Sequence, residues 1–161
     1  MKFFLWVVIF MLLTVALVMF ILMLPANAQL PNPKLTPGAV RTTRAAEICA
    51  RSFRTRPFRH TTEATKEFVC KEYGYYNYCP LRHKMEIDHL IPLELGGADE
   101  ISNLWVELAR YPDGSPGYHV KDGLETHLRW MVCKKQITLP RAQECLWDNW
   151  IACYRRLMEK K

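Results

Sequence analysis

The chain has 161 residues, of which 50% are hydrophobic and 24% charged, and its formal net charge is +6 at pH 7. This composition excludes a disordered polyelectrolyte, a collagen-like chain and a long coiled coil. The length that remains after an apolar start is enough for one domain with a hydrophobic core, but not for two. The positive charge favours an anionic partner without identifying it.

An apolar segment opens the chain. Residues 3–24 contain no charged side chain, and a triplet of small residues follows at 26–28. Together with Lys2 these features are typical of an export signal, so we expect residues 1–28 to be a signal peptide cleaved before Gln29. The run is also long enough to cross a bilayer, and an uncleaved membrane anchor is the alternative. Both alternatives place the rest of the chain outside the cytosol, as a secreted, periplasmic or envelope protein.

Six cysteines follow this segment. An even number in a small exported domain predicts up to three disulfides, and the absence of a Cys-x-x-Cys pair argues against a structural zinc site. We expect Cys70 and Cys79 to close the tyrosine-rich turn between them. Cys145 and Cys153 lie on one predicted helix about 12 Å apart along its axis, so these two are not expected to pair.

The first part of the exported chain combines a spacer with two helices. Residues 29–41 contain three prolines and are expected to form an extended linker. Apolar residues at helical spacing predict a helix within 42–52, and Thr62 is the expected N-cap of a second helix over 62–73.

Four arginines interleave with two phenylalanines between these helices. The segment is either a solvated basic loop or a strip that contacts the phosphates of a nucleic acid, since guanidinium groups suit phosphate oxygens. The four are Arg51, Arg54, Arg56 and Arg59.

Two short apolar runs bounded by turn residues, at 86–97 and 103–106, predict the strands of a hairpin with a long loop. Helical spacing then predicts helices over 119–133 and 139–158. The order of two helices, a hairpin and two helices contains no internal repeat. It predicts an α+β fold with a single domain over residues 42–161.

Asp88 and His89 carry the clearest chemical signal. The pair ends a predicted strand, a Gly-Gly turn follows, and Asn103 comes shortly afterwards. An imidazole can deprotonate water near neutral pH, an asparagine amide can hold the other ring nitrogen, and a carboxylate with one further ligand can bind a divalent cation. This set of groups suits the hydrolysis of a phosphodiester.

Residues 86–97 followed by Asn103-Leu104-Trp105 resemble the HNH endonuclease family, in particular an exported, single-domain bacterial branch of it. The similarity extends to residues 35–41, to 119–125 and to parts of the last helix. The resemblance implies a ββα-metal core, in which a hairpin and a helix clasp one divalent ion (Mg²⁺, Mn²⁺ or Zn²⁺), with further helices on the N- and C-terminal sides.

Carried over by position, the resemblance implies that His89 is the general base, Asp88 a metal ligand and Asn103 the residue that orients the base. His119 is the expected second metal ligand, and His127, two turns further along the same helix, is the competing one. About 12 Å of helix rise separates the two histidines, so both are not expected to bind one ion.

Lys121 and Glu125 lie four residues apart on this helix and are expected to form an ion pair on a solvated face. Further contacts with phosphates are expected from basic residues late in the chain. These are Lys134, Lys135, Arg155 and Arg156.

Two functional hypotheses follow. The first is an exported, metal-dependent endonuclease that hydrolyses nucleic acid, with DNA the expected substrate and little sequence preference, because no recognition module remains outside the catalytic core. The second is a non-catalytic, disulfide-stapled envelope protein that binds nucleic acid or another anionic polymer. Neither hypothesis includes a protein partner, and the membrane is a partner only if residues 1–28 stay attached.

Overall fold

The computed structural model of the chain describes Met11 and residues 30–76, 84–111 and 114–159. The expected signal peptide or anchor therefore lies, apart from Met11, outside the described residues. No helix in the described ranges is long and apolar enough to cross a membrane. The elements in chain order are α2 (Ala45–Ile48), η1 (Arg56–Phe58), α3 (Glu63–Glu72), β1 (Met85–His89), η2 (Leu93–Leu95), η3 (Ile101–Asn103), β2 (Leu104–Leu108), α4 (Tyr118–Cys133) and α5 (Leu139–Met158).

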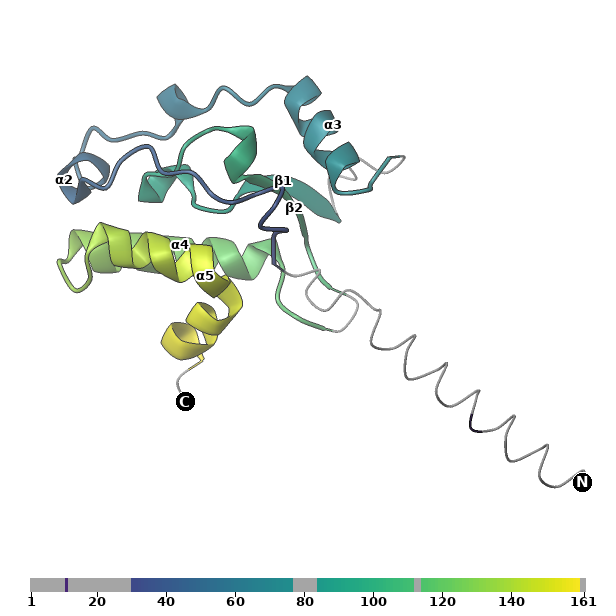
Figure 1. The fold of residues 1–161 in the computed structure, drawn as a ribbon. Coiled ribbons are helices and arrows are strands. Elements are labelled where there is room, and N and C mark those ends of the chain that lie inside the picture. The colour runs from purple at the N-terminus through teal and green to yellow at the C-terminus, as the bar shows by residue number, and fades with distance from the viewer. Residues whose placement is uncertain (1–10, 12–29, 77–83, 112–113, 160–161) are drawn as a thin grey trace, which may run out of the picture.

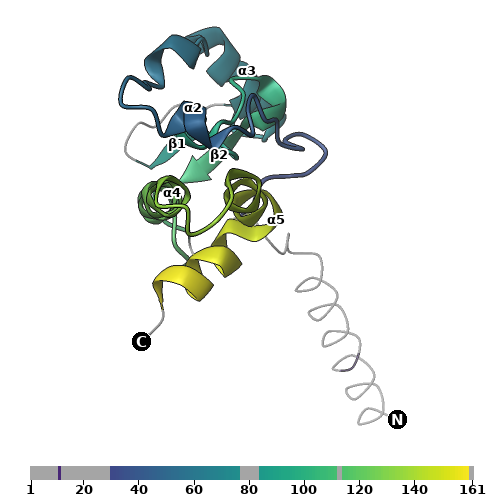
Figure 2. The same cartoon turned by 90° about the vertical axis from the view of Figure 1, so that its left-hand side faces the viewer.

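These elements form two layers (Figure 1). One layer holds the β1–β2 hairpin with α2 and α3, and the other consists of α4 and α5, which lie side by side (Figure 2). The described part of the chain is thus a mixed fold with a small two-stranded antiparallel sheet and helices before and after it. This arrangement agrees with the predicted α+β class.

The first strand of the hairpin is shorter than the apolar run that predicts it. β1 pairs antiparallel with β2, and His89, its last residue, lies opposite Leu104. The first run leaves the sheet after His89 because Pro92 has no N–H to donate to a strand partner. Residues 93–95 then form the 3-10 helix η2 instead of continuing the strand.

The second predicted helix is confirmed as α3. The hydroxyl of Thr62 accepts a hydrogen bond from the backbone N–H of Thr65 at 3.1 Å, as expected of an N-cap. The first predicted helix is reduced to the single turn of α2, since Arg44 is extended and supplies no side-chain cap. α4 begins one residue before the predicted start.

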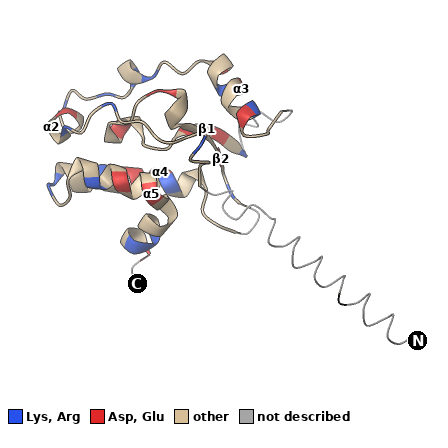
Figure 3. Cartoon of the chain, in the orientation of Figure 1, with Lys and Arg blue, Asp and Glu red and all other residues tan. Residues whose placement is uncertain are grey.

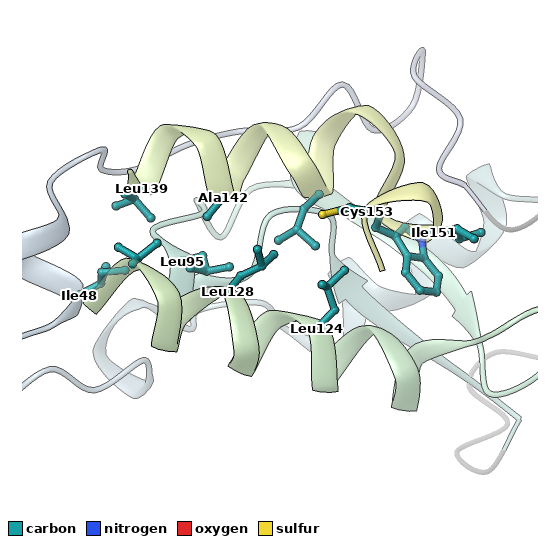
Figure 4. Packing of buried hydrophobic residues seen from close by; sticks show 11 residues of the cluster. Ile48, Leu95, Leu124, Leu128, Leu139, Ala142, Ile151 and Cys153 are labelled. Atoms are coloured by element: carbon teal, nitrogen blue, oxygen red, sulfur yellow. The ribbon is translucent and has the colours of Figure 1, made fainter. Parts of the chain in front are cut away.

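The main core lies between α4 and α5, and Figure 4 shows how their side chains interlock. Apolar residues at helical spacing line the facing sides of both helices, and Leu95 from η2 closes the core from the hairpin layer. Burying such side chains contributes about 1.5–3 kcal/mol each, before the entropy of ordering the chain is counted. The buried residues are Ile48, Leu95, Leu124, Leu128, Val132, Leu139, Ala142, Leu146, Trp150, Ile151 and Cys153.

Two disulfides join pairs of described residues, one between the two layers and one within α5. Cys49, at the end of α2, bonds Cys133, at the end of α4, with 5.4 Å between their Cα atoms. Cys145 bonds Cys153. These bonds are consistent with an oxidising environment outside the cytosol. The expected Cys70–Cys79 bond involves a residue outside the described ranges.

The Cys145–Cys153 bond corrects the sequence-based expectation that these residues lie too far apart. α5 is not one continuous helix, because Asn149 has the extended angles φ −165° and ψ 92°. The side chain of Asn149 accepts a hydrogen bond from the N–H of Ala152 at 2.9 Å and so caps a new helical segment. The kink brings the two Cα atoms to 5.7 Å, which is ordinary for a disulfide.

Candidate active site

His89 lies at the end of β1 with only 4% of its side chain exposed. Its Nε2 is 2.7 Å from Oδ1 of Asp99, in the loop between the two strands. Asp99 also accepts hydrogen bonds from the backbone N–H groups of His60 and Thr61 and from the Thr61 hydroxyl. The Asp99 carboxylate thereby connects its own loop with His89 and with the segment before α3.

The charge of Asp99 determines which nitrogen of His89 is free. Burial tends to raise the pKa of Asp99, but hydrogen bonds from Thr61, His60 and His89 outweigh burial and lower it to about 2. An ionised carboxylate can only accept, so Nε2 of His89 carries a proton. In the neutral imidazole Nδ1 is therefore the unprotonated nitrogen, which is the form that a general base requires.

Asn103 is buried but does not contact the imidazole. Its Oδ1 accepts from the N–H of Ile91 at 3.0 Å, and its Nδ2 donates to the carbonyl oxygens of Ile91 and Ala98 at 2.8 Å each. Asn103 thus stabilises the loop that carries Asp99. The contact with His89 that the sequence predicts for Asn103 is made by Asp99.

The same loop depends on Gly97. A Cβ on this residue would lie 1.8 Å from the carbonyl oxygen of Ile91 and 3.1 Å from Nδ2 of Asn103. Both atoms belong to the network that fixes the loop, so neither can move away without breaking a hydrogen bond. The Gly-Gly turn of the sequence motif is therefore a packing requirement of the site.

Lys121 on α4 is fully buried and lies at the centre of a group of carboxylates. Its Nζ donates to Oδ2 of Asp88 at 2.5 Å, to the carbonyl oxygen of His89 at 2.9 Å and to Oε1 of Glu125 at 2.5 Å. Oε2 of Glu107, on β2, is 3.5 Å away. Lys121 and Glu125, expected on a solvated face, instead meet in the interior, where the contacts of Lys121 with Asp88 and Glu107 connect α4 with both strands.

These surroundings shift the pKa values of the three acids in opposite directions. Burial opposes ionisation of Asp88, but the Lys121 ammonium lowers the pKa of Asp88 below its usual value. Burial disfavours the charge of Lys121 too, yet its carboxylate neighbours raise its pKa well above the ordinary value. Burial raises the pKa of Glu125 to about 8 and that of Glu107 well above the usual range, although Lys121 opposes both shifts. Asp88 and Lys121 therefore form the ionised pair at neutral pH.

A second group of acidic residues shares Asp88 with this pair. Glu86, Asp88 and Asp122 each offer a carboxylate oxygen, and these oxygens lie within 4.8 Å of one another. Glu86 and Asp88 share one face of β1 because side chains alternate along a strand, and Asp122 comes from α4. Three oxygen ligands of this kind suit Mg²⁺ or Mn²⁺.

Asp122, and neither of the two predicted histidines, belongs to this acidic group. His119 is exposed at the start of α4, where its ring centroid lies 4.1 Å from that of Tyr118. His127 stacks on Trp130 with 5.7 Å between ring centroids. Asp122 lies one helical turn after His119, on the same side of α4.

All four predicted arginines of the basic strip are exposed, and Figure 3 shows basic residues along the segment that joins α2 to α3. They do not form one site. Arg51 and Arg54 line a groove beside α4, whereas the charge of Arg59 acts on Glu86 in the acidic group. Arg56 begins η1. The later basic residues Lys134, Lys135, Arg155 and Arg156 lie at the ends of α4 and α5.

Sequence reasoning did not identify Asp99, Glu86 or Asp122 as members of the site. A carboxylate two residues after the Gly-Gly turn was a signal for Asp99, because a tight turn returns the chain toward the strand that precedes it. The alternation of Glu86 with Asp88 on a predicted strand was a signal for the acidic group. Asp122 could be recognised only once the position of α4 was known.

Comparisons with known proteins add no relative. No protein-family model, curated protein or solved structure matches the chain. Function is therefore inferred from the residues of the site and their geometry.

Proposed function

We propose that this protein is an exported, metal-dependent endonuclease of the HNH type that hydrolyses phosphodiester bonds in nucleic acid, with DNA as the expected substrate and little sequence preference. The single observation that carries the proposal is the buried His89–Asp99 pair at the end of the strand that also bears Asp88. It combines an oriented base with a carboxylate group suited to a divalent ion.

His89 is the general base of the proposed reaction. Asp99 holds Nε2, so Nδ1 is the nitrogen that takes a proton from the attacking water. The same carboxylate stabilises the imidazolium that forms when the proton has moved. This division of roles requires an ionised Asp99, and its pKa of about 2 supplies that condition at neutral pH.

The acidic group fits a divalent ion. Its three carboxylate oxygens come from Glu86, Asp88 and Asp122 and repel one another. Burial, together with the charges of Asp88 and Asp122, raises the pKa of Glu86 to about 7. A cation relieves this repulsion. When bound there, a divalent ion neutralises charge on the phosphate and on the leaving oxygen. Asp88 can accept the hydrogen bond from the Lys121 ammonium on Oδ2 and still offer Oδ1 to a metal ion.

Lys121 positions the two reacting parts of the site. It bonds the side chain of Asp88 and the carbonyl oxygen of His89, and so ties the end of β1 to the helix that carries Asp122. Because its side chain is fully buried, Lys121 acts through Asp88 and the backbone rather than on a substrate.

Plasmid nicking by the oxidised protein, with Mg²⁺, Mn²⁺, Zn²⁺ or a chelator, tests the proposal. Wild-type protein should cleave only with metal, and His89→Ala should lose at least about a hundredfold in rate, the usual contribution of a general base. Asp122→Asn should lose activity that added metal partly restores, whereas His119→Ala should retain most of it. Asp148→Asn, at an exposed site on α5, is the matched control for the lost carboxylate.

Two results would contradict the proposal. One is folded wild-type protein that leaves DNA and RNA intact with every metal, which favours the non-catalytic binding protein instead. The other is cleavage that persists in His89→Ala. If His119→Ala loses activity and Asp122→Asn does not, the endonuclease stands but its metal ligand is the histidine that the resemblance implies.

A further inference from the structure

A groove of about 650 Å³ lies outside the acidic group, between the loop that follows α2 and the second half of α4. One wall comes from the basic strip and the other from the helix that carries Asp122. The lining includes Arg51, Phe53, Arg54, Glu94, Arg129 and Trp130.

The Trp130 side chain lies open to solvent in the groove. It is 48% exposed, as Trp147 on α5 also is at 54%, whereas Trp105 and Trp150 are fully buried. Leaving a large aromatic ring in water forfeits the free energy that its burial supplies in a core. The ring stacks on His127 with an interplanar angle of 23°, which helps to hold its orientation in the groove.

The opposite wall is basic and ordered. Nη1 of Arg54 donates to the carbonyl oxygens of Arg51 and Phe53, at 2.8 and 2.7 Å, so its guanidinium is held at the rim. Both arginines are exposed. One acid, Glu94, also lines the groove; burial raises the pKa of its carboxyl, although the nearby charge of Arg129 opposes that shift.

The two walls are covalently connected. The Cys49–Cys133 disulfide joins the end of α2 to the end of α4 and itself lines the groove. Nη2 of Arg129 donates to the carbonyl oxygen of Ile48 at 3.0 Å and adds a second link. Because both links lie within the protein itself, they set the spacing between the aromatic wall and the basic wall.

The groove continues the face of α4 on which the acidic group lies. Asp122, Thr126, Trp130 and Cys133 follow one another at intervals of four, four and three residues, so they share one side of the helix. The rise from Asp122 to Trp130 is about 12 Å. A strand that places a phosphate at the acidic group can therefore extend along α4 to Trp130.

We infer that this groove binds a single-stranded stretch of the nucleic-acid substrate, with a base stacked on Trp130 and phosphates held by Arg51 and Arg54. The inference rests on the proposed function for the identity of the substrate. An exposed indole can stack on a base only when the base is unstacked from its neighbours, which a single strand allows and an intact duplex does not. Arginines on the facing wall complement the charge of the backbone.

The test measures binding without cleavage. A fluorescent single-stranded oligonucleotide and its duplex are titrated with oxidised His89→Ala protein in the presence of a chelator. Trp130→Ala in that background should weaken single-strand binding about tenfold or more, the range seen when one stacking aromatic is removed. Trp130→Phe should retain most of the affinity. Arg51→Ala and Arg54→Ala should each reduce the salt dependence of binding by about 0.7 in log–log slope.

Trp147→Ala is the matched control, because Trp147 is 54% exposed on α5 and does not line the groove. The inference is overturned if Trp130→Ala binds the single strand as tightly as Trp147→Ala does, or if the duplex is preferred and shows the same loss. Thermal melting of each variant verifies that the comparison is between folded proteins.

The two proposals fail in different ways. A protein that cleaves nothing but loses single-strand affinity in Trp130→Ala contradicts the nuclease and supports the groove. A protein that cleaves normally while Trp130→Ala binds like the control contradicts the groove and leaves the nuclease intact.

Discussion

His89 and Asp99 form a buried hydrogen bond of 2.7 Å between the end of β1 and the loop that follows it. The pair assigns the orienting role at the proposed base to an aspartate, whereas the resemblance to HNH endonucleases implies an asparagine at position 103. Asn103 acts indirectly, because its side chain donates hydrogen bonds to the backbone of the loop that carries Asp99.

Asp99→Asn is expected to lower kcat for cleavage roughly a hundredfold and to change KM little. The amide has no charge to stabilise an imidazolium, and its NH₂ group can turn toward His89 and reverse the tautomer. Steady-state nicking rates give both constants. Unchanged kcat in a folded Asp99→Asn protein would show that Asp99 is structural only, and Glu100→Gln, at the exposed neighbouring position, is the control.

The lowered pKa of Asp99 predicts how the free energy of unfolding depends on pH. Folding lowers the pKa of Asp99 from the usual 3.8 to about 2, so the folded state favours the carboxylate more than the unfolded chain does. Its contribution is complete above about pH 4 and disappears as the pH falls through about 2. Urea unfolding over that range should show a smaller loss for Asp99→Asn than for wild type, and an equal loss would contradict this assignment.

Lys121→Met is expected to destabilise the protein by about 3–5 kcal/mol, because it leaves Asp88 partly buried without its ion-pair partner. Lys66→Met removes an exposed lysine whose Nζ lies 2.7 Å from Glu63 and should cost less than about 1 kcal/mol. Chemical denaturation of both variants measures the difference. Equal costs would mean that the interior carboxylates do not depend on Lys121.

Glu86 should make metal binding sensitive to pH. Burial, followed by the charges of Asp88 and Asp122, raises the pKa of Glu86 to about 7. A proton therefore competes with the ion, and the affinity for Mn²⁺ should fall by up to about tenfold per pH unit below pH 7. Calorimetric titrations of wild type and Glu86→Gln test this, with Glu144→Gln on the exposed face of α5 as control. Wild-type affinity in Glu86→Gln would exclude it as a ligand.

The two disulfides between described residues should differ in how much they stabilise the fold. Cys49 and Cys133 are separated by 84 residues and Cys145 and Cys153 by 8, which in the chain-entropy account correspond to about 4.6 and about 2.5 kcal/mol. Replacing each pair by alanine and measuring unfolding under oxidising conditions compares them. A larger loss for the short loop would show that the kinked end of α5 depends on its bond for more than loop closure.

Much of the local structure could be predicted because its causes are local. The cap at Thr62 depends on a hydroxyl three residues before an N–H, and the apolar faces of α4 and α5 follow from residues such as Leu124 and Leu128 at helical spacing. The hairpin followed from two apolar runs with turn residues between them. Here sequence neighbours are also spatial neighbours.

Lys121 and Glu125 show what local sequence patterns do not predict, namely which side of a helix is buried. Their spacing predicts that they meet on a helix, and they do. It does not say which side of the helix is buried, because that depends on how β1 and β2 pack against α4. The same holds for Cys145 and Cys153, whose pairing depends on a break at Asn149 that no spacing indicates.

The sequence by itself determined α3, α4, the ends of α5, the hairpin and the residues Asp88 and His89 at the end of its first strand, because periodicity, capping and turn chemistry act over a few residues. Only the tertiary structure decided that Asp99 holds the imidazole, that Lys121 is an interior cation and that Asp122 joins Glu86 beside Asp88. These contacts join separate elements. Asp99 and Lys121 find their partners because charged groups that become buried need them once the two layers have packed together, whereas Asp122 reaches the acidic group through the position of α4.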